Sequence, residues 1–141
     1  MSVKKVLTVI IIIFFSNLVG AQSKPEKIQS KKLYEGTWVN KKAKRFIAFY
    51  YDDDVDYVTI NDWTGSSNRN KNNNIDAYKA FIKGNKLIIP AENSDHHAPY
   101  CEIEILDHKL IYKCNTGTNF IDGSLLKDNS NSTVFERINK K

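Results

Sequence analysis

The stretch CEIEILDHKLIYKC, residues 101–114, decides the fold because it predicts one particular pairing of two strands. Apolar and polar residues alternate on both sides of Asp107-His108, where aspartate tolerates the left-handed backbone of a two-residue hairpin turn. With the turn centred there, Cys101 lies opposite Cys114 on a pair without backbone hydrogen bonds, where side chains approach most closely. The stretch therefore predicts an antiparallel hairpin held by a cross-strand disulfide.

These two residues are the only cysteines of the chain, and they lack the Cys-x-x-Cys spacing that activates a thiol for redox chemistry. A structural disulfide is therefore favoured over a redox-active pair. The same register places four further side chains on the cysteine face of the hairpin: Ile103, Ile105, Leu110 and Tyr112.

Short apolar runs alternate with turn-rich gaps along the rest of the chain, which is typical of an antiparallel all-β protein. The segment 75–83 fits a helix or a strand, and Gly84-Asn85 followed at once by KLII favours a strand that forms a hairpin. Residues 120–126 fit a ninth strand or a short helical turn. We expect eight strands in an antiparallel meander, at residues 36–39, 45–51, 55–60, 76–83, 86–89, 99–106, 109–114 and 133–138.

The N-terminal residues have the layout of a secretory signal peptide. Lys4 and Lys5 precede an apolar run at 6–15, and small residues precede an expected cleavage site after Ala21. The run is shorter than the roughly 20 residues that span a bilayer, so a membrane anchor is disfavoured. We expect a signal peptide at 1–21, a flexible polar leader at 22–32 and a barrel domain at 33–141, in a secreted or periplasmic protein.

The charge of the chain argues against nucleic acid as a partner. Without Lys4 and Lys5, 19 of the 21 basic side chains remain against 16 acidic ones, a net charge of +3. Most of the lysines are scattered between apolar positions, whereas a nucleic-acid-binding domain usually carries a dense basic face.

Trp38, at the start of the first expected strand, and Arg137, in the last, are placed to seal one end of a closed barrel. The guanidinium would cross the indole face, and Gly36 would let the backbone pass closely. The alternative is an ordinary core tryptophan with an unrelated surface arginine. The pattern of Gly36, Trp38 and Arg137 in a meander of eight strands resembles the lipocalin-like (calycin) barrels. This resemblance implies an eight-stranded barrel that binds a small apolar molecule in its interior.

Candidate ligand-binding residues come from the hairpin at 45–60. With a two-residue loop at Asp53-Asp54, one face carries Ile47, Phe49, Val58 and Ile60, and the other carries Ala48, Tyr50, Tyr57 and Thr59. A face of tyrosines and small residues is typical of a pocket, although each tyrosine also fits a surface position. The expected ligand-binding residues are Tyr50, Tyr57, Tyr78 and Tyr112, with Trp63 on the long loop 61–74 as a lid, a partner contact or a buried residue.

No motif of an enzyme, cofactor site or metal site stands out, so we expect a protein without catalytic activity. Asp95, His96 and His97 with Glu92 suggest a metal site, but no ligand spacing links them to His108. Two functions fit the sequence. The first is a barrel that binds a small, apolar ligand. The second is a barrel whose loops bind a protein, for example as an inhibitor of an exported hydrolase.

Overall fold

The computed structural model describes residues 24–72, 74–92, 99–116, 126 and 130–139. The expected signal peptide and all of the segment 120–126 except Leu126 lie outside these residues. Within the described part of the chain, no helix has the length and apolar character needed to cross a bilayer. The elements in chain order are α2 (Lys24–Tyr34), β1 (Gly36–Asn40), β2 (Arg45–Tyr51), β3 (Val58–Thr64), the short 3-10 helix η1 (Arg69–Lys71), β4 (Asp76–Lys83), β5 (Lys86–Ile89), β6 (Cys101–Leu106), β7 (Lys109–Cys114) and β8 (Asn131–Arg137).

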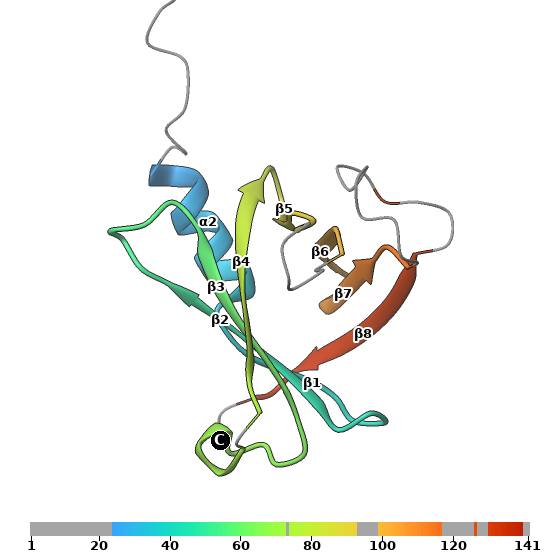
Figure 1. Ribbon diagram of the computed structural model, residues 1–141. Coiled ribbons are helices and arrows are strands. Elements are labelled where there is room, and N and C mark those ends of the chain that lie inside the picture. The colour runs from blue at the N-terminus through green and yellow to red at the C-terminus, as the bar shows by residue number, and fades with distance from the viewer. Residues whose placement is uncertain (1–23, 73, 93–98, 117–125, 127–129, 140–141) are drawn as a thin grey trace, which may run out of the picture.

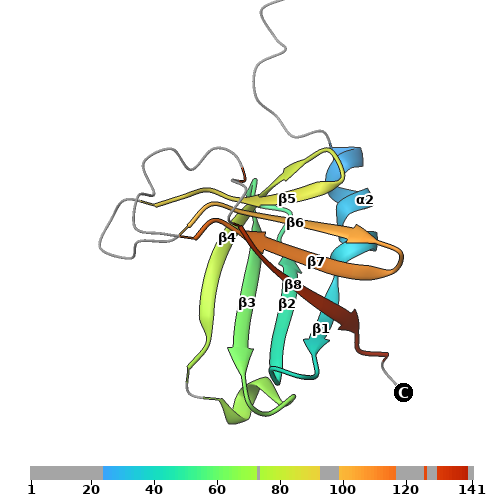
Figure 2. The same cartoon turned by 90° about the vertical axis from the view of Figure 1, so that its right-hand side faces the viewer.

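The eight strands form a closed antiparallel barrel in meander order, in which β8 pairs with β1 (Figure 1). This confirms the expected fold class. In Figure 2, β2, β3 and β4 run nearly upright while β5, β6 and β7 cross them. The two groups meet along β4, whose first residues pair with β3 and whose last three pair with β5. The segment 75–83 is thus mostly strand, as the following hairpin turn indicated.

The hairpin of β6 and β7 has the predicted register. Cys101 pairs with Cys114 and the two form a disulfide, while Ile103 pairs with Tyr112. Asp107 and His108 have φ angles of 48° and 62°. Positive φ at both central residues is what a hairpin turn of this handedness requires. The local pattern was therefore sufficient to fix this part of the barrel.

The hairpin of β2 and β3 differs from the expected one in its loop. Tyr51 pairs with Val58, so residues 52–57 form the connection in place of a two-residue turn. The Asp52 carboxylate accepts a hydrogen bond from the Asp54 backbone N–H, which begins a wider turn. The pairing is shifted by two residues, so that Phe49 pairs with Ile60 in place of Val58, and an even shift leaves the faces unchanged. It also extends β3 to Thr64, so Trp63 lies in a strand and not in the following loop.

Helix α2 occupies most of the segment expected to be a flexible leader. The Tyr34 hydroxyl, on a side chain that is 1% exposed, donates to the carbonyl oxygen of Asn85 at 2.6 Å. Ser30 is also buried and its hydroxyl lies 2.6 Å from that of Tyr51. Lys27 donates to the Val55 carbonyl oxygen at 2.7 Å. These contacts hold the helix against the turns at one end of the barrel, which we call the closed end.

Trp38 and Arg137 meet at the closed end. The indole is 1% exposed, its Nε1 donates to the Tyr34 carbonyl oxygen at 2.9 Å, and Arg137 Cζ lies 4.4 Å from the ring centroid. Arg137 also donates to the carbonyl oxygens of Leu33 and Glu35. Gly36 has a φ of +113°, which side chains with a Cβ rarely adopt. The first strand, the last strand and α2 are therefore joined around one tryptophan.

The interior of the barrel is filled by side chains. They form one buried cluster to which every strand contributes. Among the described residues, its members with the largest fully buried side chains include Tyr34, Trp38, Ile47, Phe49, Ile60, Leu87, Ile103, Leu110 and Phe135.

We predict that Trp38→Ala lowers the free energy of unfolding by about 3–5 kcal/mol, because it empties a packed core position and removes the contact with Arg137. Urea unfolding followed by circular dichroism measures the change. Val134→Ala, at a side chain that is 42% exposed, is the control and should change stability by no more than about 0.5 kcal/mol. Equal stabilities for the two variants would contradict the role of Trp38.

We also predict that reduction of the Cys101–Cys114 disulfide lowers the melting temperature. The bond closes a loop with a sequence separation of 13, which corresponds to about 3 kcal/mol in the chain-entropy description. Differential scanning calorimetry with and without reductant measures the effect. A variant with Cys101→Ser and Cys114→Ser should melt at the lower temperature in both buffers. Two titratable thiols in the native protein would show that the bond is absent.

Candidate functional site

Arg45 and Asp62 form an ion pair inside the barrel at the end away from α2, which we call the distal end. Asp62 pairs with Ile47 across the β2–β3 ladder and therefore shares its interior face. Arg45 Nε donates to Asp62 Oδ1 at 2.9 Å and Nη2 donates to Oδ2, so the contact is bidentate. The side chains are 30% and 9% exposed. Removing one partner of such a pair would leave a charge in a mostly buried place, which is destabilising.

Two tyrosines lie beside this ion pair. Arg45 Cζ is 5.2 Å from the ring centroid of Tyr112, which comes from the opposite side of the barrel. Tyr78 pairs with Ile60 and so projects from β4 into the same interior. We call Arg45, Asp62, Tyr78 and Tyr112 the distal cluster.

The hydroxyl of Tyr112 is the unusual group in the distal cluster. The residue is 5% exposed, yet no hydrogen bond joins its hydroxyl to any residue in the described ranges. No side-chain oxygen or nitrogen of those ranges is both fully buried and without a partner. Tyr112 therefore places a nearly buried phenol at the distal end of the packed core.

The electrostatics of the distal cluster keep both phenols protonated. Burial raises the pKa of Tyr112 well above its ordinary value, and the negative charge of Asp62 adds to this effect. Burial also raises the pKa of Tyr78, with smaller contributions from Asp76 and Asp62. Each hydroxyl is therefore a hydrogen-bond donor at neutral pH and also an acceptor. The cluster offers polar contacts at the edge of an apolar core.

A second cluster lies on the outer face of β2 and β3. Trp63 is 4% exposed and stacks on Phe46, with ring centroids 5.6 Å apart. Its Nε1 donates to the Ser66 carbonyl oxygen at 2.9 Å. The loop after β3 turns back over these rings, and the Asn72 amide ties it together through bonds to Ser66 and Asn68. Asparagine side chains thus supply the hydrogen bonds that stabilise this loop.

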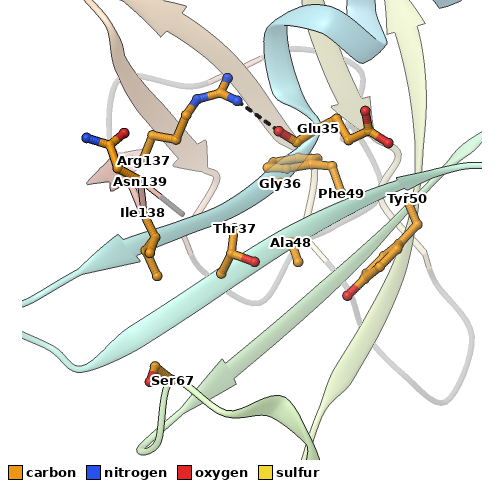
Figure 3. A pocket seen from close by; sticks show the side chains of 10 residues that line it. All are labelled: Glu35, Gly36, Thr37, Ala48, Phe49, Tyr50, Ser67, Arg137, Ile138 and Asn139. Carbon is orange, nitrogen blue, oxygen red and sulfur yellow. Dashed lines mark hydrogen bonds between the residues drawn. The ribbon is translucent and has the colours of Figure 1, made fainter. Parts of the chain in front are cut away.

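An open groove of about 900 Å³ lies beside this loop, on the outside of the barrel (Figure 3). We call it the outer groove. In Figure 3, Thr37 and Ala48 lie between Ile138 on one side and Tyr50 on the other, and Ser67 lies below them on the loop after β3. The sequence analysis did not predict this groove, because the C-terminal segment and the loop that form its walls come from distant parts of the chain.

The structure does not bring the five expected ligand-binding residues together. Tyr78 and Tyr112 lie in the distal interior, Tyr50 lines the outer groove, and Trp63 is buried under the loop. Tyr57 precedes β3, where Lys79 Nζ lies 4.7 Å from its ring centroid. The faces of β2 and β3 are divided as expected, but the face with Ala48 and Tyr50 points outward.

Arg45 and Asp62 were missed as site residues. Their signal was present in the sequence, since both continue the alternation that places Ile47 and Ile60 on one face. Two residues of opposite charge on the interior side of neighbouring strands, both near the same end of the barrel, indicate an ion pair. The third expected strand ended at Ile60, so Asp62 was not included in its ladder with the second.

No group of three or more histidine, cysteine, aspartate or glutamate side chains in the described ranges is arranged to hold a metal ion. Asp95, His96 and His97 lie outside those ranges. The chain matches no protein-family model, no curated protein and no solved structure in the comparisons made. The distal cluster and the outer groove are therefore the features that indicate a function.

We predict that stability falls as the pH rises from 10 to 12. Burial raises the pKa of Tyr51 to about 12, and burial with the Glu102 hydrogen bond does the same for Tyr100. In this range the unfolded chain releases protons that the native state keeps, so unfolding becomes more favourable. Urea unfolding at several pH values measures the effect. Tyr112→Phe should weaken this pH dependence.

The same prediction has a direct spectroscopic test. Ultraviolet absorbance of phenolate in the native protein should show Tyr112 ionising well above the ordinary pKa of a tyrosine, because burial raises its pKa. If all seven tyrosines titrated together near pH 10, the described burial would be wrong.

Proposed function

We propose that this chain is an exported, lipocalin-like protein of the calycin type that binds a small molecule in the distal interior of its barrel. The ligand is mostly apolar and carries at least one polar group that meets the distal cluster. The observation that carries this proposal is the phenol of Tyr112, which is nearly buried beside the Arg45–Asp62 ion pair and has no hydrogen-bond partner in the described ranges.

The composition of the interior supports a ligand with two kinds of surface. Ile60 and Phe135 are fully buried beside the distal cluster, so an apolar body would meet apolar side chains. Tyr78 and Tyr112 would bond the polar group, because buried hydrogen-bonding groups are normally satisfied. Arg45 is already paired with Asp62 and would contribute its position more than its charge.

The disulfide and the apolar N-terminal run support export. A cross-strand disulfide persists in an oxidising compartment, such as the periplasm or the extracellular space. The protein-binding alternative expects a filled interior and places the function in the loop 91–98, in Trp63 and in the loop 61–74. Trp63 is 4% exposed and is held beneath that loop, so a small molecule is the function that the geometry favours.

Titration of the purified protein with 8-anilinonaphthalene-1-sulfonate tests this proposal, because the probe joins an apolar body to one polar group. The protein is first unfolded and refolded to release any molecule that copurifies. We expect saturable fluorescence enhancement at one site. The double variant Tyr78→Phe and Tyr112→Phe should bind the probe about five- to tenfold more weakly, since two hydrogen bonds are lost.

The matched control is Tyr57→Phe, which removes a hydroxyl outside the interior and should leave the affinity unchanged. Tyr112→Phe should also leave the melting temperature unchanged, because its hydroxyl has no protein partner to lose within the described residues. A loss of stability without a loss of affinity would mean that the hydroxyl is structural. Probe binding equal to wild type in the double variant would overturn the proposed site.

A further inference from the structure

The outer groove has the features of a second binding site, separate from the distal interior. Its floor is made by the small side chains of Thr37 and Ala48, so a ligand can approach the backbone of β1 and β2 closely. Ala48 is only 2% exposed although it points outward, because the outer cluster around Trp63 packs against it. The groove therefore has a solid base that does not depend on the barrel interior.

The wall beside the loop is fixed before any ligand arrives. Gly65 N–H donates to the Lys44 carbonyl oxygen at 2.9 Å, and Asn72 bonds to Ser66 from the far side of the loop. Together with the Trp63 bond to Ser66, these contacts hold Ser67 in place at the groove. A site that is already formed loses less conformational entropy on binding.

Tyr50, from β2, presents an aromatic surface to the outer groove. It is 44% exposed, and Arg69 Cζ lies 5.5 Å from its ring centroid. The guanidinium of Arg69 is itself held by the Asn61 side-chain oxygen, at 3.1 Å from Nε and 2.9 Å from Nη2, when the amide is in the orientation that satisfies its hydrogen bonds. The tyrosine ring is therefore oriented, while a large part of it remains free.

Neutral polar groups line the rest of the groove. Thr37, Ser67 and Asn139 supply hydroxyl and amide groups that both donate and accept hydrogen bonds. The charged groups are of both signs and already have partners or opposite neighbours: Arg137 donates to the backbone of Leu33 and Glu35, Arg69 lies against Tyr50, and the Glu35 carboxylate lies at the rim. The groove therefore offers no concentration of one charge that would select an ionic ligand.

We propose that the outer groove binds a neutral oligosaccharide. A sugar ring has a face of C–H groups with partial positive charge, which the negative face of the Tyr50 ring attracts. The hydroxyls of further sugar units along the groove would meet Thr37, Ser67 and Asn139. A volume of about 900 Å³ in an open groove accommodates more than one sugar unit and leaves the ends of a chain free.

Nuclear magnetic resonance titration of the isotope-labelled protein tests this inference. The probes are the hexasaccharides cellohexaose, laminarihexaose, xylohexaose, maltohexaose and chitohexaose, each at millimolar concentration. We expect at least one of them to shift the amide signals of Thr37, Ala48 and Ser67. Tyr50→Ala should weaken that binding at least about tenfold, whereas Tyr50→Phe, which keeps the ring, should stay within about threefold of wild type.

Tyr57→Ala is the matched control, since it removes another tyrosine that contacts a cation but lies outside the groove. It should bind the saccharide as wild type does. The double variant Tyr78→Phe and Tyr112→Phe should also bind normally, so this inference and the proposed interior site are tested apart. The inference fails if no hexasaccharide shifts the groove signals, or if Tyr50→Ala binds as tightly as wild type.

Discussion

The closure of the barrel depends on the contact between Trp38 and Arg137. The ladder between β1 and β8 has only two residue pairs, so backbone hydrogen bonding alone holds this seam weakly. The stacked guanidinium adds roughly 0.5–2 kcal/mol, and the same arginine reaches the backbone on either side of Tyr34. The indole in turn bonds to the end of α2. The helix, the first strand and the last strand are thus fixed together, and the packed core lies directly behind them.

Features set by local sequence could be predicted, and those set by distant contacts could not. The β6–β7 register followed from a two-residue turn flanked by alternating residues, which involve only neighbours in the chain. Helix α2 was missed because its sequence is polar and carries Pro25, and only Ser30 and Tyr34 are buried. Its stability comes from contacts with turns more than 20 residues away, such as the Lys27 bond to Val55.

The candidate sites show a limit of pattern reading. Alternation in β2 and β3 correctly divided the side chains into two faces, but both faces carry large apolar residues, so the pattern did not identify the interior one. Phe46 and Trp63 are covered by a loop whose asparagines bond to one another, and a propensity argument treats such residues only as breakers of regular structure. As a result, Tyr50, which was expected to line a ligand-binding pocket inside the barrel, lies on its outer face.

The bonds from Arg137 to Leu33 and Glu35 join residues separated by 104 and 102 positions. A barrel sealed by its last strand cannot close while that strand is still being synthesised, because the seal requires almost the whole chain. Contacts of such long range slow folding, since chain entropy is lost before they form. The barrel therefore stays open until β8 has paired with β1 and Arg137 has reached Trp38.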